Sequence, residues 1–301
     1  MNNYKSGFVS IIGRPNVGKS TLLNQILKEK LAIVTPKAQT TRNKIQGIYT
    51  TDNEQVIFVD TPGIHTAHHE LGEVMNKMAF SSFEGMDVII WLIDGTTEIT
   101  EFDLKIVEGL KKVDAPVILA VNKVDLVKNN SDVEKVINGY KEAFNFKGGI
   151  TISAMLNHNV DKLVEIVVEL LPFGPQYYPD DQLLDQPEKF VVSELIREKV
   201  LLCTSEEVPH SVAVGIESFK TSKKNPNLIE ISATIVVERQ SQKKIVIGKG
   251  GQMIKKIGTL ARTDIVKFLG NKVYLELFVK VEEDWRNKKS QLKEFGYKLE
   301  N

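Results

Sequence analysis

The first half of the chain contains five short apolar runs, separated by polar and turn-forming residues. They span residues 8–12, 55–60, 87–94, 116–122 and 149–153. Between most of these runs, apolar residues recur at the spacing of a helix that is buried on one side, as they do from Leu22 to Leu27. Buried strands that alternate with such helices are typical of a mostly parallel sheet with helices on both faces. We therefore expect an α/β domain over residues 1–172.

The pattern changes after residue 172. Residues 173–188 contain three prolines and little periodicity, which is typical of a linker. Residues 282–301 are polar and charged, and we expect them to form a fraying tail. Between these two segments we expect a smaller α+β domain, residues 189–281. Its apolar positions predict a helix over 190–202, strands over 211–219 and 228–238, a helix over 251–270 that ends at Gly270, and a strand over 272–281.

The composition is that of a globular protein, with 42% apolar and 26% charged residues. No apolar run approaches the roughly 20 residues of a membrane-spanning helix, and the first residues lack the features of a signal peptide. Cys203 is the only cysteine, so no internal disulfide can form, and we expect a reducing, cytoplasmic setting.

The net charge of zero conceals an asymmetry between the two halves. Residues 1–187 contain 18 basic and 24 acidic residues, whereas residues 188–301 contain 21 and 15. A basic second half favours a nucleic-acid or membrane surface as its partner, although an asymmetry of this size also arises by chance.

Residues Gly13–Ser20, GRPNVGKS, match the phosphate-binding pattern G-x-x-x-x-G-K-[ST]. They follow an expected strand and precede an expected helix, as this pattern requires. Glycines let backbone N–H groups turn toward phosphates, and the helix N-terminus adds positive potential. Lys19 would supply a charge to the β- and γ-phosphates, and Ser20 would ligate Mg²⁺. The expected nucleotide contacts in this loop are Gly13, Arg14, Pro15, Asn16, Val17, Gly18, Lys19, Ser20 and Thr21.

Two later segments indicate which nucleotide is bound. Asn122 ends the expected strand 116–122, and Lys123 and Asp125 follow it, so all three lie at the carboxyl end of the sheet, beside the first loop. A carboxylate such as Asp125 accepts hydrogen bonds from the N1–H and N2–H₂ groups of guanine, whereas adenine would leave it unpaired at a cost. Ser153 and Ala154, at the end of another strand, can offer a backbone N–H to guanine O6. These residues favour a guanine nucleotide.

Two further segments are suited to sense a γ-phosphate. Asp60 ends the expected strand 55–60, and Thr61, Pro62 and Gly63 follow it, so that Asp60 can hold Mg²⁺ through water and the Gly63 N–H can meet the γ-phosphate. Thr40 and Thr41 precede the next strand, and a threonine there can close on Mg²⁺ when a triphosphate is bound. We expect Ser20, Thr41 and Asp60 to form the metal site.

A second glycine-rich stretch, IVIGKGGQMI, spans residues 245–254. No G-K-[ST] follows it, and the residues before it predict a short helix, so the loop joins two helices. A G-x-x-G loop between helices is the KH arrangement, which clamps the backbone of about four nucleotides. We expect Ile245, Ile247, Ile254 and Ile257 to floor an apolar groove. The predicted RNA contacts are Arg239, Lys243, Lys244, Ile247, Gly248, Lys249, Gly250, Gly251, Lys255 and Lys256.

The motifs GRPNVGKS, QTTR, DTPG, NKVD and ISA resemble those of translation-factor-class small GTPases. With IVIGKGGQMI after them, residues 5–281 resemble the Era family of bacterial ribosome-assembly GTPases. The resemblance implies a P-loop GTPase domain followed by a type II KH domain. It implies a monomer that binds GTP and GDP, contacts 16S rRNA near its 3′ end and assists assembly of the 30S ribosomal subunit. Weak peripheral contact with the cytoplasmic side of the cell membrane is also described for such proteins.

The resemblance also implies slow, Mg²⁺-dependent hydrolysis of GTP to GDP and phosphate. Lys19, Thr41, Gly63 and Asn16 are the expected catalytic residues. Ile64 stands where Ras-like enzymes have a water-orienting glutamine, so no side chain there can donate or accept. Asn16 either helps to hold K⁺ near the phosphates, as in relatives of this group, or stabilises the loop. The alternative function is a signalling GTPase whose C-terminal domain docks a protein or a membrane.

Overall fold

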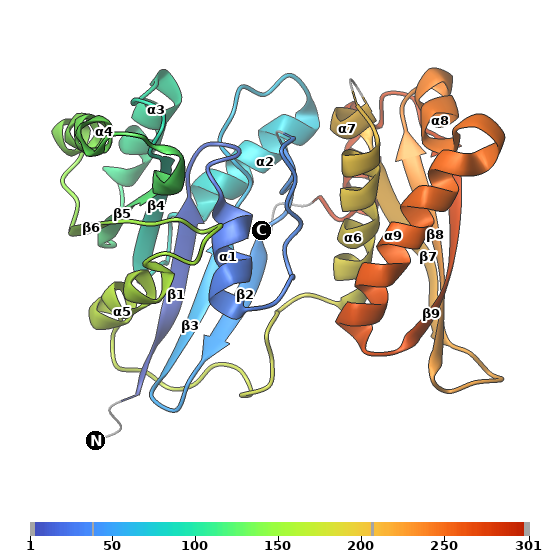
Figure 1. The fold of residues 1–301 in the computed structure, drawn as a ribbon, viewed down its shortest axis with the longest axis horizontal. Helices are drawn as coiled ribbons and strands as arrows, with labels where there is room; N and C mark the ends of the chain where they lie inside the picture. Colours follow the sequence, from blue (N-terminus) through green and yellow to red (C-terminus); the bar gives the residue numbers. More distant parts are fainter. Residues whose placement is uncertain (1–3, 38, 206–207, 298–301) are drawn as a thin grey trace. The chain divides into compact units, whose positions relative to one another are not determined.

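The computed structural model describes residues 4–37, 39–205 and 208–297 and divides them into two compact units (Figure 1). The first unit contains the described residues up to Ala32, then Thr41–His68 and Gly72–Asp185. The second contains the described residues from Gln186 onward, together with the described part of Ile33–Thr40 and His69–Leu71. Two segments from the N-terminal half of the sequence therefore pack with the C-terminal half.

The first unit is built on a six-stranded sheet with the strand order β2-β3-β1-β4-β5-β6. Only β2 runs antiparallel to its neighbour, so the predicted mostly parallel sheet is confirmed. The sequence pattern missed β2, because its alternation is interrupted by Gly47 and ends in Tyr49 and Thr50. The strands are β1 (Lys5–Ile12), β2 (Ile45–Thr50), β3 (Glu54–Asp60), β4 (Val88–Asp94), β5 (Val117–Asn122) and β6 (Gly148–Thr151).

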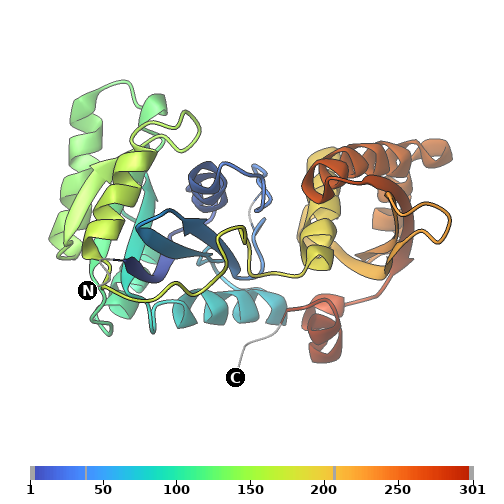
Figure 2. The same ribbon diagram turned by 90° about the horizontal axis from the view of Figure 1, so that it is seen from below.

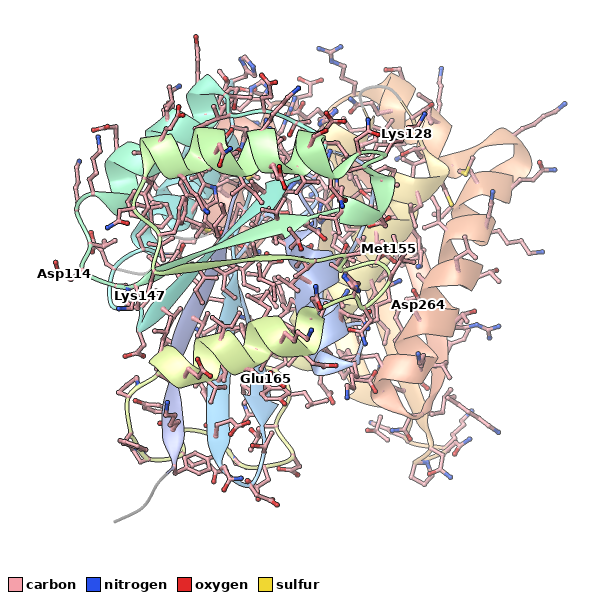
Figure 3. The ribbon with its side chains drawn as sticks, turned by 60° about the vertical axis from the view of Figure 1, so that its left-hand side comes forward. Asp114, Lys128, Lys147, Met155, Glu165 and Asp264 are labelled. Atoms are coloured by element: carbon pink, nitrogen blue, oxygen red, sulfur yellow. The ribbon has the colours of Figure 1, made fainter. Side chains whose placement is uncertain are left out.

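Helices cover both faces of this sheet, as predicted. On one face, α1 (Lys19–Leu27) contacts α5 (Val160–Leu170) and the strands β2 and β3. The other face carries α2 (Glu70–Ser81), α3 (Glu101–Leu110) and α4 (Asn130–Ala143), whose apolar residues form one core around Trp91. Figure 3 shows α4 and α5 on opposite sides of the sheet.

The proline-rich segment that the sequence predicts as a linker lies along the first unit up to Asp185. Gln55 of β3 holds it through three bonds, donating from Nε2 to the Tyr178 carbonyl and accepting from the amides of Tyr177 and Tyr178. Farther on, the Ile48 amide donates to the Leu183 carbonyl at 2.9 Å. The chain leaves the first unit at Asp185, and α6 begins at Glu188.

The second unit has a three-stranded sheet in the order β7-β8-β9, with β7 antiparallel and β9 parallel to β8. The helices α6 and α9 pack against each other and against this sheet (Figure 2). This arrangement confirms the predicted α+β fold, and β9 has the predicted bounds. The elements are α6 (Glu188–Cys203), α7 (Val208–Ser211), β7 (Ala213–Thr221), β8 (Leu228–Val237), α8 (Gln240–Ile247), α9 (Gln252–Leu269) and β9 (Lys272–Val281).

The prediction of a fraying tail from residue 282 is wrong for the part of it that the structure describes. A short 3₁₀ helix (Trp285–Asn287) and α10 (Lys289–Glu294) follow β9. Trp285 is fully buried and its Nε1 donates to the Ser211 carbonyl at 2.9 Å. Arg286 forms a two-bonded fork with Glu238. Residues 298–301 of the predicted tail lie outside the described residues.

None of the helices in the described ranges is both long enough and apolar enough to cross a membrane.

Candidate functional site

The first glycine-rich loop joins β1 to α1, as the sequence predicts. Gly18 has φ +105°, and a Cβ there would lie 2.3 Å from Nδ2 of Asn122, so no other residue fits. Lys19 is buried, and its Nζ donates to the carbonyl oxygens of Gly13 and Arg14 at 3.0 and 2.9 Å. Burial lowers the pKa of Lys19 to about 8, although Asp60 acts in the opposite direction. The ammonium group therefore lies within the loop that would receive phosphates.

Arg14 belongs to the same loop, but its side chain is engaged elsewhere. Its Nε lies 3.2 Å from Oδ2 of the buried Asp103, and its Nη2 donates to Thr97. These contacts involve two of the three guanidinium nitrogens of Arg14.

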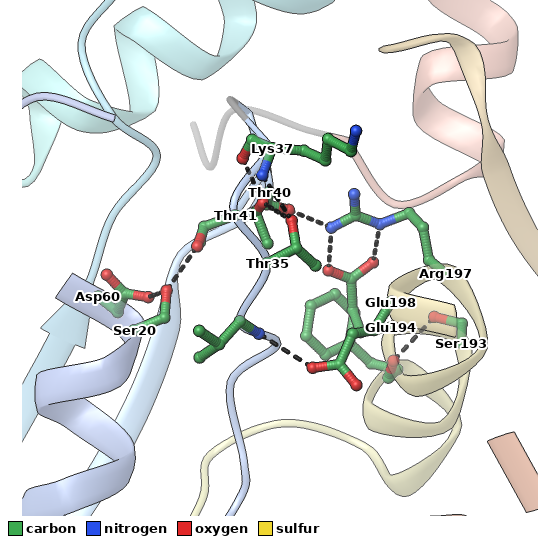
Figure 4. Close-up of polar contacts among 12 residues, drawn as sticks. Ser20, Thr35, Lys37, Thr40, Thr41, Asp60, Ser193, Glu194, Arg197 and Glu198 are labelled. Atoms are coloured by element: carbon green, nitrogen blue, oxygen red, sulfur yellow. Dashed lines mark hydrogen bonds and ion pairs between the residues drawn. The ribbon is translucent and has the colours of Figure 1, made fainter. Parts of the chain in front are cut away.

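Three oxygen-bearing side chains meet beside the loop. Ser20 Oγ lies 2.7 Å from Oγ1 of Thr41 and donates to Oδ2 of Asp60 at 2.6 Å (Figure 4). Oδ1 of Asp60 is buried and has no hydrogen-bond partner among the described residues. Burial raises the pKa of Asp60 to about 6. A hard divalent cation fits this site, because it prefers oxygen ligands and would satisfy the buried carboxylate.

The segment after β3 packs directly on the first loop. A Cβ on Gly63 would lie 2.6 Å from the backbone nitrogen of Pro15, so glycine is required by this close approach. Oγ1 of Thr61 donates to the Ile11 carbonyl and ties the segment to β1. Ile64 is buried in the core around Trp91. An isoleucine here serves packing, which gives a structural reason for the missing glutamine.

Asn122 connects the first loop to the predicted base-binding segments. Its Nδ2 donates to the Val17 carbonyl, and its Oδ1 accepts from the Ala154 amide at 2.9 Å. Lys123 Nζ forms a 2.7 Å ion pair with Asp94. Asp125 is exposed at the same end of the sheet. The structure thus brings the residues predicted to recognise guanine together with the phosphate loop.

Asn16 has φ +64°. Asparagine adopts this left-handed backbone conformation more readily than most residues, so the loop geometry alone gives a reason for it.

The second glycine-rich loop joins α8 to α9, as predicted. Gly248 has φ +72°, and a Cβ there would lie 2.6 Å from Cβ of Met253, so the turn between the helices requires glycine. Oε1 of Gln242 accepts hydrogen bonds from the backbone amides of Glu238 and Arg239 and so fixes the start of α8. Lys243 is half-buried, whereas the other predicted basic contacts are exposed: Arg239, Lys244, Lys249, Lys255 and Lys256.

A groove of about 370 Å³ lies between α9 and β9, beside this loop. Ile254 lines it as predicted, but Ile257 is fully buried in the core and Ile245 is exposed on α8 outside the groove lining. Thr259 and Arg262 follow Lys255 at helical spacing, but they lie beyond the charged cluster and were not among the predicted contacts. The groove is lined by Ile254, Lys255, Gly258, Thr259, Arg262, Val273, Tyr274, Leu275 and Leu277.

Comparison with known proteins matches both units. The family profile described as 50S ribosome-binding GTPase matches residues 8–123, and the KH domain profile matches residues 207–286. A crystal structure of an Aquifex aeolicus Era variant bound to GDP and AlF₄⁻ is 40% identical over 98% of this chain and 100% of its own, with a TM-score of 0.94. The chain belongs to the Era family of GTPases.

A second Era structure shows the same degree of similarity. It is an Era complex with MgGDPNP and nucleotides 1506–1542 of 16S ribosomal RNA, 40% identical over 98% of this chain and 100% of its own, with a TM-score of 0.95. Both Era structures match over the glycine-rich loop of the first unit and that of the second. The predicted fold class, a P-loop GTPase domain followed by a KH domain, is therefore confirmed.

Proposed function

We propose that this Era-family protein binds and hydrolyses GTP in its first unit and binds 16S rRNA near its 3′ end through its KH domain. Its cellular role is then to assist assembly of the 30S subunit in the cytoplasm. The observation that carries the proposal is the presence, in one chain, of the cluster Ser20–Thr41–Asp60 beside Lys19 and of the basic loop Gly248–Gly251 beside a groove. The Era structures with GDP·AlF₄⁻ and with MgGDPNP and rRNA support both halves.

In the first unit, the residues of this chain bind and orient the nucleotide. Lys19 turns from the Gly13 and Arg14 carbonyls to the β- and γ-phosphates, whose negative charge favours its protonated form. Asp125 pairs with the guanine edge, and Asn122 holds the two loops in register. Ser20, Thr41 and Asp60 would hold Mg²⁺, which offsets charge on the phosphates when bound.

The chemistry proceeds slowly because no side chain at Ile64 orients the attacking water. The Gly63 N–H contacts the γ-phosphate and becomes part of the hydrolytic arrangement only while a triphosphate is present. Catalysis by this chain then consists of positioning and charge compensation, with no protein group acting as the base.

We also propose that Asn16 contributes an oxygen to a K⁺ ion near the phosphates. Comparing GTP turnover in equal concentrations of KCl and NaCl tests this, with Asn16→Ala as the matched variant. Faster turnover in KCl that the variant loses supports the ion. Equal rates in both salts would assign Asn16 to the loop conformation alone.

The proposed function is tested by two measurements on the purified full-length chain. Binding of GTP and ATP in the presence of Mg²⁺ should differ strongly in favour of GTP, and Lys19→Ala should remove GTP binding.

An RNA oligonucleotide of the 16S 3′ end should bind with a steep dependence on salt concentration, because phosphate contacts release counterions. A protein that binds no RNA at low ionic strength would instead fit a signalling GTPase that docks another protein or a membrane.

A further inference from the structure

The helix α6 is buried on two faces, one apolar and one charged. Val192, Leu195 and Ile196 are among its buried apolar residues. Four of its six charged residues are buried as well, and Arg197 has no exposed surface. Charged side chains are rarely buried unless they are paired, so this second face needs a specific partner. The buried charged residues are Glu194, Arg197, Glu198 and Lys199.

The partner of this charged face is the segment Ile33–Thr40. Nη2 of Arg197 donates to the carbonyl oxygen of Thr40, and the same guanidinium forms a fork with Glu194, at 2.7 Å from Nε and 2.5 Å from Nη2 (Figure 4). One turn away from Glu194, Oε1 of Glu198 accepts a hydrogen bond from the Val34 amide at 3.1 Å. The described part of the segment is therefore held to α6 at both of its ends.

The helix is itself anchored within the second unit. Lys199 pairs with Glu198 at 2.6 Å and with Asp264 of α9 at 2.5 Å. The fork with Glu194 fixes the plane of the guanidinium, so that one N–H is aimed at the Thr40 carbonyl. A lysine could not hold two carboxylate oxygens and a carbonyl in this planar arrangement.

The Thr40 carbonyl belongs to the peptide bond that begins Thr41. That bond is planar, so holding the carbonyl also fixes the plane of the Thr41 amide. The Thr40 side chain is fixed too, through Thr35 Oγ1 at 2.6 Å and the Lys37 carbonyl at 2.7 Å. Thr41 Oγ1 then lies 2.7 Å from Ser20 Oγ, in the cluster that fits Mg²⁺.

We propose that Arg197 is a positioning residue for Thr41. By holding the Thr40 carbonyl, it keeps the Thr41 hydroxyl at the metal cluster and so favours the triphosphate-bound arrangement over the diphosphate-bound one. The inference rests on the proposed GTPase function and extends it, because the positioning group lies on α6, outside the nucleotide-binding motifs. GDP binding depends on the phosphate loop and on Asn122 and Asp125, none of which Arg197 contacts in the described structure.

The test compares the affinities of full-length variants for fluorescent GDP and for a fluorescent non-hydrolysable GTP analogue, both with Mg²⁺. Arg197→Lys and Arg197→Gln should weaken binding of the analogue about tenfold, which corresponds to the loss of one charge-assisted hydrogen bond, and leave GDP binding within about twofold. Arg286→Gln is the matched control, because it breaks an arginine–glutamate fork of the same kind elsewhere in the second unit. It should change neither affinity.

The two proposals fail in different ways. If wild-type protein binds neither nucleotide, the proposed function fails. If wild-type binds both and the Arg197 variants lose both equally, or lose neither, Arg197 does not position Thr41. Far-UV circular dichroism shows which variants are folded. If Arg197→Gln fails to fold, the two nucleotide affinities of Arg197→Lys decide the test, because this variant retains the charge beside Glu194.

Discussion

Nδ2 of Asn122 donates a hydrogen bond to the carbonyl oxygen of Val17, 2.8 Å away across 105 residues of sequence. The opposite side of the same amide accepts the Ala154 N–H. One buried side chain thus joins the phosphate loop to both segments expected to meet the guanine base. The relationship explains why a polar residue occupies the last position of the otherwise apolar strand β5.

Replacing Asn122 with alanine should destabilise the nucleotide-free protein by about 2–4 kcal/mol, because two buried backbone groups lose their partner. GTP affinity should fall as well, since the phosphate loop and the segment at Ala154 lose the side chain that holds them together. Urea unfolding and a nucleotide titration measure the two effects. Asn129→Ala is the control, because that side chain pairs with Asp132 at an exposed position. Equal destabilisation by both substitutions would contradict the connecting role.

The pKa of Asp60 predicts how metal binding depends on pH. Burial raises this pKa to about 6, so the carboxyl group of the nucleotide-free protein takes up a proton below that pH. A protonated carboxyl is a poor ligand for Mg²⁺. The Mg²⁺-dependent part of GTP-analogue binding should therefore decline as the pH falls from 7 to 5. Asp60→Asn should bind weakly and show no such decline.

The same shift affects folding with the opposite sign. An unfolded aspartate ionises near pH 4, whereas folded Asp60 keeps its proton up to about pH 6. Its contribution to the free energy of unfolding is therefore fully present below pH 4 and is lost as the pH rises through 6. The free energy of unfolding of the metal-free protein, measured at pH 4.5 and pH 7, should show this loss. The free energy of unfolding of Asp60→Asn should not show it.

Charge reversal at Lys249 should weaken RNA binding without affecting the fold. The side chain is exposed at the centre of the second loop. Lys249→Glu should lower affinity for the 16S 3′ end and reduce the slope of log affinity against log salt by about one. Lys267→Glu, at the far end of α9, is the control and should leave the slope unchanged. Gly248 is a poorer choice, because a side chain there would collide with Met253.

The sequence patterns predicted those elements whose apolar residues repeat regularly and whose ends carry clear signals. Residues 251–270 are an example, since the structure ends α9 at Leu269 with Gly270 at φ +66°. Missed elements have weaker patterns. For α4, the apolar residues Val133, Val136 and Ile137 are interspersed with many polar ones, because that helix buries only one narrow stripe. The packing of the tail was not predicted because its buried residues, Trp285, Leu292 and Tyr297, are few and separated by polar ones.

Motif spacing located the phosphate loop and the glycine clamp, since each motif is local. It could not locate Arg197, because the contact with Thr40 spans 157 residues and involves a backbone carbonyl that any residue could supply. The low amphipathicity of residues 188–203, with charges interleaved among apolar residues, was the only signal. A helix of that kind has to bury both of its faces. In the structure, the segment that contains Val34 and Thr40 covers the charged face.

Trp285 should account for much of the stability that the C-terminal residues give the second unit. Trp285→Ala should cost about 3–5 kcal/mol, because it empties a fully buried site. Trp285→Phe keeps most of the volume but loses the hydrogen bond to the Ser211 carbonyl, so it should cost about 1 kcal/mol. Thermal unfolding followed by circular dichroism measures both. A negligible effect of the alanine variant would restore the picture of a loosely attached tail.

The extended segment that ends at Asp185 lies along β2, the outermost strand of the first sheet. The Ile48 amide donates to Leu183, and the Asp185 amide donates to Gln46. Backbone groups on an outer strand otherwise offer a template on which another molecule can add its own strand. A protease cut within residues 177–185 would remove this cover, and the nicked protein should then self-associate in a concentration-dependent way while its nucleotide pocket stays intact.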